Sequence, residues 1–383
     1  MPLPDLVPDL EALESACLLR RRRSVEGALG PRVTVGGREL VCFASNDYLG
    51  LAADPRLVQA ACEGARALGV GAGASHLVCG HNAAHEALEG RLAEFVGMPR
   101  ALLFSTGYMA NLGIVTALLD RHDAVFADRL NHACLNDAAL LSRAHFRRYA
   151  HGDLVALERF LSTSPAPRKL VASDAVFSMN GDIAPVPELL GLCERYGAWL
   201  LLDDAHGFGV LGRSGRGVLS HFDLRSPNVI YMGTLGKAAG VFGAFVAGDP
   251  PLIETLVQRA RPYIYTTALP PLLARVLLSS VEAIVGESWR RERLASRIAQ
   301  LKSSLRPGRW RLLPSDTPIQ PIVIGSSKDA LQAALALEES GLWVPVIRPP
   351  TVPKGTARLR ISLSAGHTEA DVSALVDCLN RLR

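Results

Sequence analysis

The sequence predicts an α/β protein in which a mostly parallel sheet is covered by helices, followed by a smaller α+β domain. Three observations indicate this fold class. Short apolar runs alternate with helical stretches through the middle of the chain. The 383 residues are 49% hydrophobic and 20% charged, which is enough for a large buried core. Strands and helices alternate again near the C-terminus. We expect an N-terminal segment (1–42), a large domain (43–275) and a small domain (276–383).

The first elements are a helix and a hairpin. Apolar spacing predicts an amphipathic helix over residues 10–23, with the arginines at 20–23 on its solvated face. Gly36 and Gly37 then predict the turn of a short hairpin.

The central apolar runs predict the strands of the main sheet, and helical stretches connect them. The expected strands are residues 101–104, 124–127, 169–173, 199–202, 229–232 and 244–246. A helix is expected to begin at Gly107 and run toward Leu119. A long helical stretch follows Pro271 and reaches about Gln300. Strands are then expected near Trp310 and over 321–324 and 358–362.

Composition argues against several classes of protein. A net charge of +4 is too small for this length to predict nucleic-acid binding. No apolar run is long enough for a membrane span, and the N-terminus lacks a basic-then-apolar signal, so we expect a cytoplasmic protein. Seven scattered cysteines without a CxxC pair predict reduced thiols and no metal site. Cys79 is expected to be a small core residue.

One lysine carries the strongest chemical signal. Lys237 follows Thr234 and Gly236 within a long apolar, glycine-rich segment, where a solvated surface lysine is not expected. Asp203 and His206 follow an apolar strand, at the end of the sheet where α/β proteins bind ligands. An amine that forms a Schiff base, a hydroxyl near a phosphate and a carboxylate for a pyridine nitrogen are the groups that pyridoxal phosphate (PLP) requires.

Two glycine-containing segments are candidates for phosphate binding. Residues 105–111 lie where a strand ends and a helix begins, and Gly107 allows close approach to backbone N–H groups. A plain helix cap explains the same segment. Residues 69–75 do not fit a dinucleotide fingerprint, because no strand precedes them, and a mobile loop near the site is expected.

Six motifs in their order along the chain resemble the α-oxoamine synthase family of fold type I PLP enzymes. The match covers nearly the whole chain, and the motifs are Ser45-Asn46-Asp47-Tyr48-Leu49-Gly50, Asp128-Arg129-Leu130-Asn131-His132-Ala133, residues 176–182, Asp203-Asp204-Ala205-His206-Gly207, Thr234-Leu235-Gly236-Lys237 and residues 357–362. Residues 347–353 resemble the corresponding segment of the biotin-pathway branch. That branch condenses L-alanine with a pimeloyl thioester of coenzyme A or acyl carrier protein.

The resemblance implies a role for each matched residue. Lys237 would bind the cofactor and remove the alanine α-proton, Asp203 would pair with the pyridine nitrogen, His206 with the phenolic oxygen, and His132 would stack on the ring. Other cofactor contacts implied in this way are Gly107, Tyr108, Ser178, Thr234, Thr266 and Thr267. Arg348 would bind the amino-acid carboxylate, and the remaining substrate contacts would be Arg20, Asn46, His132 and Thr351. The segment 263–268 would reach the partner subunit of a homodimer.

Four positions depart from the usual family pattern. Asp174 replaces a common glutamate, Asn180 a common aspartate, Phe208 a common threonine, and His76 a glycine or arginine. Other readings also remain. Glycine C-acyltransferase, 5-aminolevulinate synthase and sphingolipid-type synthases would share the catalytic residues, and an aminotransferase would share Lys237 and Asp203. A non-enzymatic subunit would be expected to lack the lysine.

Overall fold

The computed structural model describes residues 5–306 and 308–382, which form two compact units. The large unit contains residues 49–178 and 182–291. The small unit contains residues 1–48, 179–181 and 292–383, so it combines the N-terminal segment with the C-terminal part of the chain.

The large unit is built on a seven-stranded sheet with the order β3-β9-β8-β7-β6-β4-β5. Neighbouring strands are parallel except for β9, which is antiparallel to both β3 and β8. The mostly parallel sheet and all six central strands predicted from apolar runs are confirmed. The strands are β3 (Arg100–Phe104), β4 (Ala124–Asp128), β5 (His145–Tyr149), β6 (Lys169–Asp174), β7 (Trp199–Asp203), β8 (Val229–Thr234) and β9 (Ala244–Gly248).

Strand β5 was not predicted, because it is an edge strand. Its sequence His-Phe-Arg-Arg-Tyr exposes most of its side chains, with Tyr149 the buried member. An edge strand pairs on one side only, and charged side chains at such an edge discourage pairing with other chains. Its polar sequence therefore gives no apolar run to detect.

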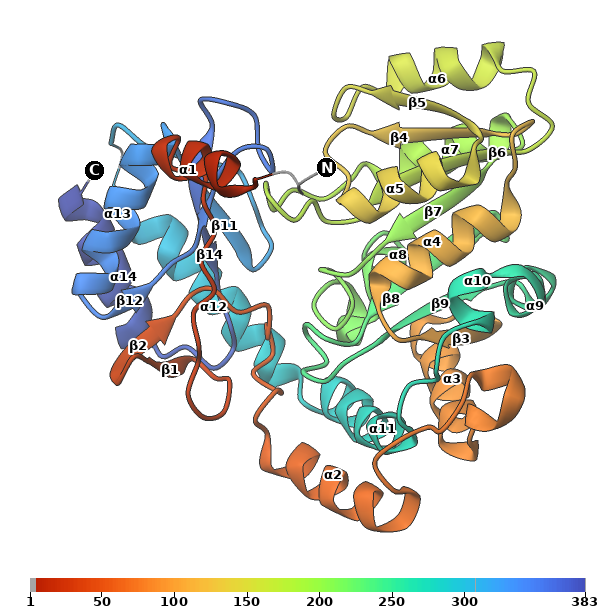
Figure 1. Ribbon diagram of the computed structural model, residues 1–383, viewed down its shortest axis with the longest axis horizontal. Helices are drawn as coiled ribbons and strands as arrows, with labels where there is room; N and C mark the ends of the chain where they lie inside the picture. Colours follow the sequence, from red (N-terminus) through yellow and green to blue (C-terminus); the bar gives the residue numbers. More distant parts are fainter. Residues whose placement is uncertain (1–4, 307, 383) are drawn as a thin grey trace. The chain divides into compact units, whose positions relative to one another are not determined.

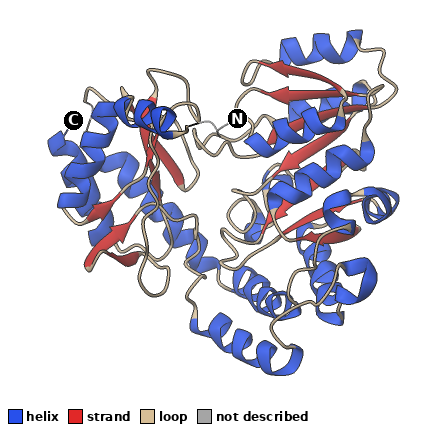
Figure 2. Cartoon of the chain, in the orientation of Figure 1, coloured by secondary structure: helices blue, strands red, loops and turns tan. Residues whose placement is uncertain are grey.

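Helices cover both faces of this sheet, because successive side chains of each strand point to opposite faces. Val125 and Ala127 of β4 belong to the buried cluster that includes residues of α4 and α5, whereas Phe126 contacts Phe160 of α6. Figure 1 shows α4 and α5 in front of the strands, and Figure 2 shows the sheet flanked by helices.

The helices of the large unit include the one predicted from Gly107. They are α2 (Pro55–Leu68), a π-helical turn (His76–Gly80), α3 (Ala83–Val96), α4 (Gly107–Leu118), α5 (Ala133–Ser142), α6 (Leu154–Thr163), α7 (Val186–Arg195), a 3₁₀ turn (Arg213–Gly215), α8 (Val218–His221), α9 (Pro250–Arg259), α10 (Arg261–Ile264) and α11 (Pro271–Gly286). The long helical stretch predicted after Pro271 is two helices, because α11 ends at Gly286 and α12 (Ser288–Ser304) follows. The boundary between the units falls inside α12.

The small unit contains two short sheets. A hairpin turning at Gly36 and Gly37, both with positive φ, joins the first two strands, as predicted. One sheet has β1 (Arg32–Val35), β2 (Arg38–Cys42) and β12 (Leu342–Trp343); the other, in the order β10-β11-β14-β13, has β10 (Arg311–Leu312), β11 (Ile319–Gly325), β13 (Val346–Ile347) and β14 (Ala357–Ser362). The helices are α1 (Val7–Ser15), α13 (Ser327–Glu339) and α14 (Glu369–Leu382). The parallel pairing of β2 with β12 attaches the N-terminal segment to the C-terminal part.

The N-terminal helix is shorter than predicted. Helix α1 ends at Ser15 and buries none of its side chains, so no packing favours its extension. Cys17 adopts φ +57°, which right-handed helices do not allow. The arginines at 20–23 therefore follow the helix and do not form its solvated face. Arg23 pairs with Glu338 of α13 at 2.7 Å.

Two further sequence expectations concern burial. Cys79 is exposed and is not the core residue that we predicted. It lies in the π-helical turn, of which His76 and Gly80 are the buried residues. Within the described part of the chain, no helix combines the length and apolar character that crossing a membrane requires.

Candidate active site

The predicted lysine and aspartate lie at the same edge of the large sheet. Asp203 is the last residue of β7, and Lys237 comes three residues after the end of the neighbouring parallel strand β8. Parallel neighbours deliver their carboxyl ends to one edge, so the two side chains are brought into one site. Lys237 is half-buried, and Leu235, Ala238 and Ala239 around it are buried.

The Asp203 carboxylate is held in place by two donors. Its side chain is 6% exposed. The amide of Asn111 in α4 donates to one oxygen at 2.7 Å, and the backbone N–H of Ala205 donates to the other at 3.0 Å. Because a carboxylate can accept about four hydrogen bonds, it keeps capacity for about two further donors.

Lys237 contacts the histidine predicted beside it. Its Nζ lies 3.1 Å from Nε2 of His206. Thr234 donates its hydroxyl to the carbonyl oxygen of Ala205 at 3.3 Å, which links the end of β8 to the loop that carries His206. The amine, the imidazole and the carboxylate are therefore held by two adjacent strand ends.

His132 lines the same cavity as these residues and caps helix α5. Its Nδ1 accepts from the backbone N–H of Cys134 at 3.3 Å, and its backbone N–H donates to the Asp174 carboxyl at 3.1 Å. Burial lowers the pKa of His132, and the neighbouring Lys237 charge acts in the same direction while Asp203 opposes it. The lowered pKa favours the uncharged form of the ring.

Asp174, one of the departures from the family pattern, is buried beside this site. Burial and then the Asp203 charge raise the pKa of Asp174 well above its usual value. The shorter side chain still reaches the backbone N–H of His132 through both carboxyl oxygens. Asp174 therefore fixes the turn that carries His132.

A cavity of about 200 Å³ lies among these side chains. Eight of the predicted cofactor residues line it: Gly107, Tyr108, His132, Ser178, Asp203, His206, Thr234 and Lys237. A Cβ at Gly107 would lie 2.7 Å from Cγ2 of Thr234, so only glycine permits this approach. Thr106 caps the start of α4 by accepting from the N–H of Met109. The first turn of α4 is thus open to an anion.

The donor set of this cavity fits PLP. Lys237 would supply the amine for the aldehyde, and the buried Asp203 would supply the anion for the pyridine nitrogen. The start of α4 would bind the phosphate, and Thr234 lines the same cavity with its hydroxyl donated to the Ala205 carbonyl oxygen.

The sequence did not reveal every residue of this site. Asn111, Cys134, Val176, Ala205 and Met232 were given no role. Asn111 is fully buried and donates to both Asp203 and the sulfur of Cys134. The available signal was its position one helical turn after Gly107, which places it on the face of α4 that bears on the site.

Six predicted residues are not part of this cavity. Thr266 and Thr267 do not line it, and Thr267 is exposed, paired with Ser75 in an isolated bridge. The other four, Arg20, Asn46, Arg348 and Thr351, belong to the small unit.

Three of those small-unit residues gather around one cavity. Arg20, Arg348 and Thr351 line a space of about 280 Å³. The Arg348 guanidinium donates to the carbonyl oxygens of Cys17 and Leu19, which ties the segment after α1 to this cavity.

Asn46 lies elsewhere in the small unit. Its amide oxygen accepts from the Tyr48 hydroxyl and from Arg360, both at 3.1 Å. Asn180 is another departure from the family pattern. Its side-chain oxygen accepts a hydrogen bond from the Arg358 guanidinium at 2.7 Å.

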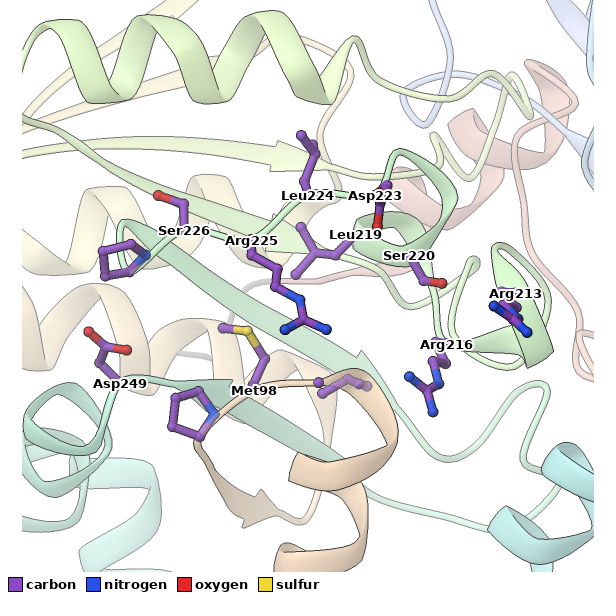
Figure 3. Close-up of a pocket in the computed structure, with 14 residues that line it drawn as sticks. Met98, Arg213, Arg216, Leu219, Ser220, Asp223, Leu224, Arg225, Ser226 and Asp249 are labelled. Atoms are coloured by element: carbon purple, nitrogen blue, oxygen red, sulfur yellow. The ribbon is translucent and has the colours of Figure 1, made fainter.

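A larger cavity in the large unit contains none of the predicted residues. It measures about 720 Å³ and lies between residues 96–99 and the segment 213–227. Figure 3 shows Arg213, Arg216 and Arg225 around it. The residues that line this cavity come just before β3 and β8 and just after the antiparallel strand β9. It therefore lies at the edge of the sheet where β8 begins, whereas Asp203 and Lys237 lie at the edge where β7 and β8 end. Side-chain chemistry therefore identifies the candidate site, whereas volume does not.

Known proteins resemble the chain over almost its whole length. The aminotransferase class I and II family model matches residues 38–379. The 8-amino-7-oxononanoate synthase of Nitrosospira multiformis is 64% identical over 365 residues, covering 95% of this chain and 92% of that relative. The chain belongs to the aminotransferase class I and II family, as an α-oxoamine synthase.

Other relatives support the assignment of this chain to the α-oxoamine synthases. The 8-amino-7-oxononanoate synthase of Nitrosomonas europaea is 61% identical, covering 99% of each chain. A solved serine palmitoyltransferase of S. paucimobilis, with a bound PLP–myriocin aldimine, has a TM-score of 0.93 at 30% identity and covers 98% of this chain and 96% of its own. The solved structure of the 8-amino-7-oxononanoate synthase of Francisella tularensis has a TM-score of 0.77 at 30% identity. The match covers 89% of this chain and 97% of that protein.

Proposed function

We propose that this α-oxoamine synthase condenses L-alanine with a pimeloyl thioester to give 8-amino-7-oxononanoate, CO₂ and the free carrier thiol. The observation that carries the proposal is the 58–64% identity, over nearly the whole chain, to several 8-amino-7-oxononanoate synthases. The cavity around Lys237 supports it, because its residues fit the required cofactor.

PLP, when bound, supplies a conjugated ring that accepts the electrons released when alanine loses its α-proton and when the condensed product loses CO₂. Lys237 holds the cofactor and then removes the α-proton through Nζ. His206, 3.1 Å from that nitrogen, orients it. The buried residues Leu235, Ala238 and Ala239 flank Lys237 in the chain.

Asp203 keeps the pyridine nitrogen protonated in this scheme. Asn111 and the N–H of Ala205 hold its carboxylate in one orientation. Buried hydrogen-bond donors of this kind fix a catalytic group before substrate arrives. His132 lines the same cavity, where its ring would lie against the cofactor.

Arginines of the small unit provide the groups that the two carboxylates of the substrates need. We assign the alanine carboxylate to Arg348, whose planar guanidinium suits two-pronged binding. We assign the distal carboxylate of the pimeloyl chain to Arg20, and Thr351 lines the same cavity. Asn46 is proposed as a further substrate contact.

Substrate comparison tests this assignment. L-alanine with a pimeloyl thioester is expected to exceed glycine with acetyl or succinyl thioester in kcat/KM. One methyl group contributes roughly 1–3 kcal/mol, so discrimination between alanine and glycine is incomplete. Arg20→Ala should impair use of the pimeloyl substrate more than use of an uncharged acyl chain. A preference for glycine with a short acyl group would assign the chain to another branch of the family.

The enzyme is further proposed to be a cytoplasmic homodimer. Thr266 and Thr267 belong to the segment 263–268, which resembles the family segment that reaches the partner subunit, and the exposure of Thr267 supports a role in a partner's phosphate site. Light scattering alongside an activity assay tests this. Full activity of a monomer in dilute solution would contradict it.

A further inference from the structure

Three histidines of the large unit lie together away from the candidate active site. One ring nitrogen from each of His76, His81 and His85 lies within 4.8 Å of the others. None of the three lines the cavity around Lys237. His76 is one of the departures from the family pattern, so the residue roles that the family resemblance implies do not explain it.

The local backbone brings His76 and His81 into direct contact. His76 begins the π-helical turn and His81 caps its C-terminal end, a spacing of five residues. The π-helical hydrogen bond joins residues five apart, so both side chains lie on one face. Their Nδ1 atoms are 3.0 Å apart. One metal ion at roughly 2.0–2.1 Å from both nitrogens would need them about 2.9–3.4 Å apart for bond angles of roughly 90–110°.

His85 does not have a free ring nitrogen. Its Nδ1 accepts from the backbone N–H of Asn82 at 3.0 Å, as part of the cap of α3. Its Nε2 therefore carries the proton and donates to the carbonyl oxygen of Leu269 at 2.6 Å. His85 closes one side of the cluster, and the lone pairs available for a metal are those of His76 and His81.

The surroundings favour metal binding by these two rings. His76 stacks on Tyr263, with ring centres 4.8 Å apart and planes at 9°, which fixes its orientation. His81 is exposed, so an ion can enter from solvent.

We propose that Nδ1 of His76 and Nδ1 of His81 bind one divalent transition-metal ion, with solvent completing its coordination. Two neutral imidazoles select copper, nickel or zinc over magnesium or calcium, and affinity should be greater for Cu²⁺ than for Zn²⁺. The cysteine spacing in the sequence could not predict this metal site, because both proposed ligands are histidines. His76 was noted in the sequence only as a departure from the family pattern.

Metal titration of the PLP-loaded enzyme tests the proposal. After treatment with a chelator, the wild type and His81→Ala are titrated with Zn²⁺ and with Cu²⁺ by calorimetry. The exposed His81 can be replaced without disturbing the core. His145→Ala, which removes an exposed histidine of β5, is the matched control. We expect wild type and control to bind one more ion per chain than His81→Ala, or to bind it at least tenfold more tightly.

Spectroscopy and stability distinguish this site from adventitious binding. The Cu²⁺ electron paramagnetic resonance spectrum should show coupling to two imidazole nitrogens in the wild type, and this signal should be lost in His81→Ala. Zn²⁺ should raise the melting temperature of wild type and of His145→Ala, but not of His81→Ala. Equal titration curves for wild type and His81→Ala, or coupling to a single nitrogen, would overturn the proposal.

Discussion

His151 lies between two carboxylates, and replacing it should lower the stability of the large unit by an amount that depends on pH. Its Nδ1 is 3.1 Å from Asp128, and its Nε2 is 2.8 Å from Asp182. Carboxylates only accept, so both ring nitrogens must carry protons and the ring is charged. These two hydrogen bonds raise the pKa of His151 from 6.5 to about 10, although partial burial opposes them.

The expected size of the effect follows from this pKa. At about 1.4 kcal/mol per pH unit, the rise corresponds to about 5 kcal/mol of preference for the charged ring. The ring is 30% exposed, so solvent screens the pair, and we expect His151→Gln to cost about 2 kcal/mol. That cost lowers the melting temperature by roughly 4 °C for a unit of this size.

The pH dependence gives the prediction its sign. Because the folded pKa lies above the unfolded one, the stabilisation is fully present below pH 6.5 and is lost as the pH rises through about 10. Melting temperatures of wild type and His151→Gln should therefore differ at pH 6.0 and converge at pH 10.5. His145→Gln, an exposed histidine on β5, is the control and should follow the wild type. A difference that stays constant with pH would refute the charged-ring reasoning.

Three further predictions concern the site itself. Lys237→Ala should remove turnover and the absorbance of the lysine-bound cofactor while alanine still binds; normal turnover would exclude Lys237 as the base. Asp203→Asn keeps the size but removes the charge, so exchange of the alanine α-hydrogen with solvent deuterium should slow; an unchanged rate would exclude this role. Asn111→Ala removes the 2.7 Å donor to Asp203 and should weaken PLP binding or activity by roughly 10–100-fold, as measured by cofactor titration. Unaltered PLP binding and activity would show that the N–H of Ala205 alone orients Asp203.

The sequence by itself determined the main sheet and the core of the candidate site. Buried parallel strands need apolar side chains on both faces, so their runs stand out without knowledge of their partners. Lys237 and Asp203 were found for the same reason, because each follows such a run and adjacent parallel strands share an edge.

Tertiary structure decided the features that depend on distant or weakly patterned segments. Asn111 meets Asp203 across 92 positions of sequence, a contact created by the packing of α4 on the sheet. Helix α1 ends early because nothing buries its face, and apolar spacing alone does not report that. The N-terminal hairpin joins the small unit through the pairing of β2 with β12. His76 and His81 face each other because the backbone forms a π-helical turn, which the sequence analysis did not predict.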